Sequence, residues 1–127
     1  MAGRIYEGFV PGRHLIDSYG NGGFRFAEMS HRGSILALPS GIRAWPVARA
    51  SEIDEASLAG VFAESDSVDL LLLGTGADVA AVPNALRLRL REAGIGLDVM
   101  QTGAAARTYN ILVGENRKIG AALIAVD

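Results

Sequence analysis

The chain contains no cysteine, and this absence excludes several kinds of chemistry at once. Without thiols there can be no disulfide, no thiolate nucleophile, no cysteine-bound zinc and no iron–sulfur cluster. Histidine is scarce as well: only His14 and His31 occur, and their spacing is not that of a metal site. No Gly-x-Ser-x-Gly nucleophile elbow is present. We therefore expect no metal and no cofactor, and the sequence identifies no catalytic residue.

The chain also lacks long apolar runs and a strong net charge. No apolar run approaches the ~20 residues that span a bilayer, and the first residues do not form a signal pattern. A formal charge of −2 gives no general attraction to nucleic acid or to an anionic membrane. With 127 residues, half of them hydrophobic, we expect one domain over residues 1–127 of a cytoplasmic protein. A peripheral position on the inner membrane stays open.

The most informative pattern lies between residues 68 and 110, where two apolar runs each end in a turn of small residues. Residues 68–73 are almost entirely apolar, as in a strand that is covered on both faces, and Gly74 follows them. The second run, residues 97–101, leads into Thr102. Because a helix is expected between the runs, they should be parallel neighbours whose turns meet at one edge of the sheet. That edge is where open α/β sheets usually bind ligands.

The sequence patterns in the segment between the two runs disagree on whether it forms a strand or a helix. Leucine and arginine alternate over residues 86–91, which favours a strand. However, these residue types form helices well, Pro83 suits a first helical turn and Gly94 suits a helix end. A parallel connection also needs a crossover, which is usually helical. We predict a helix whose outward Leu88 is a candidate partner contact, although single exposed leucines are common on protein surfaces.

The N-terminal third is rich in glycine and in β-forming residues. Residues 15–26 predict either two short strands around a glycine-rich turn or one bulged strand, and residues 31–33 predict a turn. Further strands are expected at residues 34–38, 42–47 and 118–126, and further helices at residues 51–64 and 103–113. Thr102 is expected to cap the last helix.

The candidate ligand-binding residues lie in the two turns and in the helix that follows the second. Free N–H groups at the start of this helix, with Arg107 one turn further on, could hold an anion. The structural alternative is that Thr102 is only a cap, Arg107 pairs with a carboxylate, and Asn110 ties down a loop. A dinucleotide site is disfavoured because Val79 occupies a position that needs a small residue. The candidates are Gly74, Thr75, Gly76, Thr102, Gly103, Arg107, Thr108, Tyr109 and Asn110.

The order of these motifs resembles a known family of small single-domain proteins of unknown function, which includes the mitochondrial assembly factor three of respiratory complex I. The similar segments are residues 70–76, 94–95, 98–102, 105, 107–110 and 120–124. The resemblance extends over nearly the whole chain, from Gly33 and Trp45 to the last strand. The mitochondrial relatives lack the equivalent of Arg107.

The resemblance implies a three-layer α/β fold around a central mixed five-stranded sheet, whose last strand is antiparallel to the others. It also implies a non-enzymatic protein that aids the assembly of complex I (NADH:ubiquinone oxidoreductase), or of a related membrane-associated complex, by binding subunits and other assembly factors. Two alternatives remain open. One is a protein or enzyme that binds an anion or nucleotide in the crevice between residues 74–76 and 102–110, and the other is a homo-oligomer that pairs through its β-rich N-terminal edge.

Overall fold

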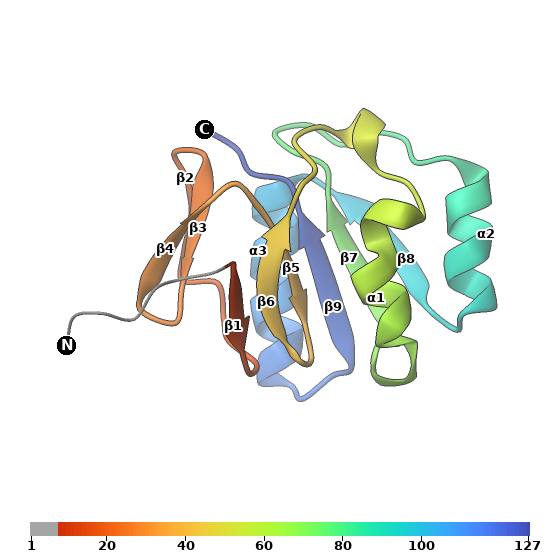
Figure 1. Cartoon of the computed structure of the whole chain (residues 1–127), viewed down its shortest axis with the longest axis horizontal. Coiled ribbons are helices and arrows are strands. Elements are labelled where there is room, and N and C mark those ends of the chain that lie inside the picture. Colours follow the sequence, from red (N-terminus) through yellow and green to blue (C-terminus); the bar gives the residue numbers. More distant parts are fainter. Residues whose placement is uncertain (1–7) are drawn as a thin grey trace.

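The computed structural model describes residues 8–127 (Figure 1). Its strands are β1 (Phe9–Pro11), β2 (Ser18–Gly20), β3 (Gly23–Phe26), β4 (Met29–Arg32), β5 (Ser34–Leu38), β6 (Gly41–Trp45), β7 (Leu70–Gly74), β8 (Gly96–Met100) and β9 (Ile119–Leu123). Its α-helices are α1 (Ala59–Ala63), α2 (Asn84–Glu92) and α3 (Thr102–Gly114). Within these residues, six strands form the main sheet in the order β1-β6-β5-β9-β7-β8, and β2, β3 and β4 form a small second sheet.

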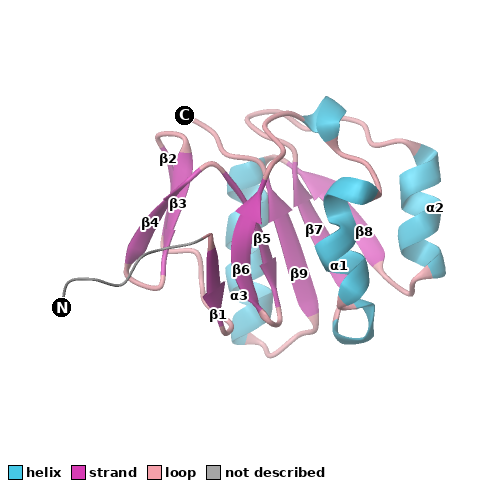
Figure 2. Cartoon of the chain, in the orientation of Figure 1, coloured by secondary structure: helices cyan, strands magenta, loops and turns pink. Residues whose placement is uncertain are grey.

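The main sheet is covered on both faces, which confirms the predicted three layers (Figure 2). Side chains alternate between the two faces of a strand. On β7, Leu71 and Leu73 therefore join one hydrophobic core with α1 and α2, whereas Leu72 joins a second core with α3 and the small sheet. Apolar residues occur without interruption in β7 because side chains on both faces of this strand are buried in a hydrophobic core.

Two details of the predicted sheet are wrong: it has six strands rather than five, and the last strand is not antiparallel to the others. β9 pairs parallel with β7 and antiparallel only with β5. The reason is the 13-residue helix α3, which carries the chain back across one face of the sheet. β9 consequently starts at the same end as β8 and runs in the same direction. The additional strand is β1, which pairs with β6 at the sheet edge, where Pro11 is tolerated.

The structure resolves the conflict over residues 83–93 in favour of a helix. β7 and β8 are parallel, so the chain between them must cross over, and this tertiary requirement overrides the alternating pattern. Leu86 and Leu90 of α2 are buried, and Leu88 is 54% exposed, as predicted.

The N-terminal third is β-rich, as predicted, but it contains a strand that the sequence analysis missed. β2 and β3 form a hairpin around Asn21 and Gly22, which both have positive φ. β4 occupies residues 29–32, where a turn was expected from residue 31. The tight turn before β4 is made by Ala27 and Glu28 at φ values of 51° and 63°, and neither residue type signals such a turn.

The predicted helix over residues 51–64 is mostly absent. Only α1 is α-helical, and it follows two single-turn 3-10 helices, Ala50–Glu52 and Ala56–Leu58. Asp54 lies between these two helices and is bonded to Ser57 in the second: Ser57 N donates to Asp54 Oδ1, and Ser57 Oγ donates to the carbonyl of Asp54. Such local side-chain bonds offer the backbone an alternative to a continuous helix.

Candidate functional site

The carboxyl ends of three parallel strands meet at one edge of the main sheet, as the sequence predicted for two of them. Gly74 at the end of β7 lies opposite Met100 of β8 and Leu123 of β9. The chain segments beyond these ends are also joined, because Thr75 N donates to Met100 O at 3.0 Å and Thr102 N donates to Gly76 O at 2.9 Å. The two turns of small residues are therefore neighbours in space.

Thr102 connects these segments, and its predicted role as a helix cap is wrong. The residue is completely buried. Its Oγ1 donates to the carbonyl of Ile124 at 2.7 Å and accepts the N–H of Gly76 at 3.0 Å. Gln101 is the cap residue of α3, and its side chain makes no capping hydrogen bond. Thr102 consequently ties β9 and the turn after β7 to the start of α3.

Gly74 permits the close packing at this edge. A Cβ atom at residue 74 would lie 2.9 Å from the Cα of Thr102 and 3.0 Å from Cδ2 of Leu123. Gly76 has φ +108°, which a residue with a side chain rarely adopts. The structure thus accounts for both glycines without a ligand.

An open hollow of about 540 Å³, which we call the strand-end hollow, lies beside these strand ends. Among the candidate residues, Thr75, Gly76 and Gly103 line it, whereas Gly74 and Thr102 lie beneath. The hollow is also lined by Tyr19, Arg49 and Asp127, among other residues that the sequence analysis did not select. The C-terminal segment reaches this position because Gly22 N donates to Val126 O at 2.8 Å. No local motif could have revealed these residues, since tertiary contacts bring them there.

The remaining candidates lie further along α3 and face residues 13–19. Arg107 does not pair with a carboxylate among the described residues; it donates to the Tyr19 hydroxyl at 3.1 Å. Arg107 and Asn110 line a second hollow of about 300 Å³ that Tyr19 also borders. Thr108 is half-buried and lines neither hollow. Tyr19 therefore stands between Arg107 and the strand-end hollow.

Two of these candidates hold the N-terminal segment on the fold. Asn110 accepts the N–H of Ile16 and donates to its carbonyl, both at 2.8 Å, which matches the structural alternative for this residue. Tyr109 is buried, and its hydroxyl donates to His14 O at 3.1 Å. Burial raises the pKa of the Tyr109 hydroxyl above its ordinary value of 10.0, although the Arg13 guanidinium acts in the opposite direction.

Replacing Asn110 with alanine should cost about 1–3 kcal/mol of unfolding free energy, because the N–H and C=O of buried Ile16 would both lose their partner. Urea unfolding measures this difference. Asn84→Ala is the matched control on an exposed helix surface and should change stability by less than about 0.5 kcal/mol. Equal effects of the two substitutions would contradict the anchoring role of Asn110.

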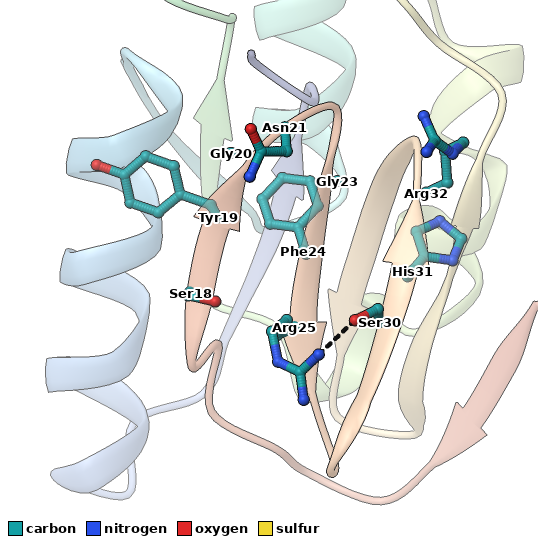
Figure 3. Close-up of a pocket in the computed structure, with 10 residues that line it drawn as sticks. All are labelled: Ser18, Tyr19, Gly20, Asn21, Gly23, Phe24, Arg25, Ser30, His31 and Arg32. Carbon is teal, nitrogen blue, oxygen red and sulfur yellow. Dashed lines mark hydrogen bonds between the residues drawn. The ribbon is translucent and has the colours of Figure 1, made fainter.

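A third hollow, of about 440 Å³, lies on the small sheet (Figure 3). Phe24 and His31 stand opposite each other on β3 and β4 and are buried, while Arg25 donates to Ser30 Oγ. Nε2 of His31 is hydrogen-bonded to Ser34 O, and Nε2 of His14 to Pro11 O. Both histidines therefore contribute to local structure.

Over residues 8–127, no three side chains of the His, Cys, Asp and Glu types gather as metal ligands would. None of the helices in the same residues is long and apolar enough to cross a membrane.

Residues 16–124 match a protein family described as "Protein of unknown function (DUF498/DUF598)". An uncharacterized protein of Rhodobacter capsulatus is 41% identical over 94% of this chain and 87% of its own length. The mouse NADH dehydrogenase (ubiquinone) 1 alpha subcomplex assembly factor 3 is 30% identical over 94% of this chain. The chain spans only 65% of the mouse protein.

A solved structure shows the same fold. The solution structure of the Rpa2829 protein from Rhodopseudomonas palustris is 50% identical, with a TM-score of 0.84 over 99% of this chain and 93% of the other. The full-length agreement in fold, the family match and the homology to assembly factor 3 lead to one conclusion: this chain belongs to the DUF498/DUF598 family.

Proposed function

We propose that this protein is a non-enzymatic binding protein that aids the assembly of respiratory complex I or of a related membrane-associated complex. The observation that carries the proposal is the homology to assembly factor 3, which extends over 94% of this chain. The shared region thus includes both layers of helices and the strand ends between them. An assembly role at the level of the family is supported by this homology.

The proposed partners are subunits and assembly factors of that complex, which the protein meets as a peripheral component at the cytoplasmic face of the inner membrane. A binding protein needs exposed apolar side chains that its own core does not use. Leu88 on α2 and Ile111 on α3 are 54% and 61% exposed, and they lie on opposite outer layers of the fold. These two positions are available to partners.

Deleting the gene should lower the amount of mature complex I and its NADH:ubiquinone oxidoreductase activity, and the intact gene should restore both. Native gel electrophoresis of membranes measures the complex, and succinate dehydrogenase serves as the control for general damage to respiration. Normal complex I in the deletion strain, together with affinity purification that recovers only unrelated proteins, would contradict the proposal.

A second candidate function is the binding of an anion or nucleotide in the strand-end hollow. The observation that favours it is the position of this hollow at the carboxyl ends of β7, β8 and β9, beside a helix start that no side chain caps. The guanidinium of Arg49 in the lining would supply the positive charge.

Thermal unfolding with millimolar inorganic phosphate or nucleotides tests this second function. A ligand present at 100 times its Kd stabilises a protein by about 2.7 kcal/mol, so the melting temperature should rise clearly. The rise should be smaller for Arg49→Gln and unchanged for Arg117→Gln, because Arg117 is exposed and outside the hollow. An unchanged melting temperature with every compound would remove this candidate.

A further inference from the structure

The main sheet ends in an edge that no other strand covers. β8 is its last strand and pairs only with β7 among the described residues (Figure 2). Gly96 N donates to Asp69 O, and Met100 O accepts from Thr75 N, so alternate residues of β8 direct their backbone groups toward β7. The N–H and C=O groups of Leu97 and Val99 consequently point away from the sheet. Such an edge is a template for another strand.

Two uncompensated positive charges lie beside this edge, on α2. Arg89 is paired with Glu55 and Glu92. Arg87 and Arg91, four residues apart on the same helix face, form no ion pair with any of residues 8–127. Each guanidinium therefore keeps its full set of donors for an external carboxylate.

The charges and the strand edge belong to one groove. A groove of about 330 Å³ runs between α2 and the start of β8 and is lined by Arg87, Arg91, Gly94, Ile95, Gly96 and Leu97. Gly94 and Gly96 have no side chains, so another backbone can approach closely there. Leu88, the most exposed leucine of α2, lies next to Arg87 on the same helix.

We infer that this groove and the free edge of β8 form a docking surface for an extended, acidic segment of a partner protein, which adds to the main sheet as a further strand. The inference rests on the proposed function and specifies the chemistry of the partner. The docking surface is made by Arg87, Leu88, Arg91, Leu97 and Val99. Backbone pairing would provide affinity, and the two arginines would select the side chains.

The geometry also specifies the pattern of the partner segment. Side chains of an added strand alternate between the two faces of the sheet. Leu97 and Val99 pack toward the core beneath α2, so partner side chains on that face meet the arginines and should be acidic. Asp98 is exposed and projects to the opposite face, where further acidic side chains would be repelled. The expected segment is acidic at every second position.

A second copy of this chain does not fit the same edge. Two-fold pairing of β8 with β8 would place Arg87 and Arg91 of both copies side by side. Like charges that face each other across an interface are destabilising, so a heterologous acidic segment is favoured over a homodimer.

Photo-crosslinking in cells that make the protein tests the inference. A p-benzoylphenylalanine probe replaces Leu88, and the control probe replaces Ile111 on the opposite layer. We expect the probe at residue 88 to capture one protein through a segment that mass spectrometry shows to be acidic at alternate positions.

Arg87→Glu combined with Arg91→Glu should lower the yield of this crosslink at least about tenfold, whereas Arg117→Glu should leave it unchanged. Val99→Pro, which removes one outward N–H group at an edge where proline is tolerated, should also lower the yield.

The outcomes separate the docking surface from the proposed function. A complex I subunit or assembly factor captured at residue 88 supports both. An unrelated protein captured there through an alternately acidic segment supports the docking surface, and it contradicts the proposed function if the deletion strain also keeps normal complex I. Capture of a complex I component only at residue 111, or a yield at residue 88 that survives the double charge reversal in a folded protein, overturns the docking surface.

Discussion

Replacing Leu72 with alanine should lower the free energy of unfolding by about 2–5 kcal/mol, the range found when a fully buried leucine is truncated. Leu72 is completely buried in the middle of β7, opposite Ala121 of β9. It belongs to the core beneath α3, where Ala105 and Ala106 bring the helix close to the sheet. These small neighbours cannot extend into the space that the leucine side chain would leave, so a cavity should remain.

Chemical denaturation of the purified protein measures this loss. Leu88→Ala is the matched control, because the same atoms are removed from an exposed side chain, and we expect a change within about 0.5 kcal/mol. Comparable losses at both positions would contradict the assignment of Leu72 to the core and of Leu88 to the surface.

Replacing Thr102 with valine should cost about 2–4 kcal/mol, although the two side chains have nearly the same shape. The substitution removes the hydroxyl that donates to Ile124 O and accepts from Gly76 N. Both backbone groups are buried, and a buried group without a partner costs about 1–3 kcal/mol. Of the bonds that join the three segments at the strand ends, the backbone bond from Thr102 N to Gly76 O would remain, and the two bonds of the hydroxyl would be lost.

Thr102→Ser is the control for this prediction, because it keeps the hydroxyl and removes one methyl group, at a cost of about 1 kcal/mol. Amide hydrogen exchange adds a local measurement: the Gly76 N–H should exchange faster in the valine variant than in the serine variant. If valine proves as stable as serine, the hydrogen bonds of Thr102 are not what holds this edge together.

The central part of the fold was predictable because its hydrophobic patterns are strong. The uninterrupted leucines of β7, the helix α2 and the parallel arrangement of β7 with β8 all follow from apolar runs and from the geometry of a crossover. The direction of β9 was not predictable from its own residues. It depends on α3 crossing the sheet, and the antiparallel last strand that was expected from the family resemblance was wrong.

The candidate site was predictable only where its residues are close in sequence to the strand ends. Thr75, Gly76 and Gly103 follow directly from the strand-turn pattern. Tyr19 and Arg49 reach the same hollow through the small sheet and through the irregular segment after β6. The hydrogen bonds of Thr102 were missed for a related reason: its partner Ile124 lies directly after β9, and only the tertiary fold brings the two together.

The position of β9 within the sheet has a consequence for biosynthesis. β9 comes after all other strands in the chain, yet it lies between β5 and β7, which do not pair with each other. During synthesis on the ribosome, the hairpin of β5 and β6 and the parallel pair of β7 and β8 therefore have no strand that joins them until β9 is made. The native sheet closes only after residues 119–123 have left the exit tunnel, through pairings such as Ile35 with Leu123 that are distant in sequence and correspondingly slow to form.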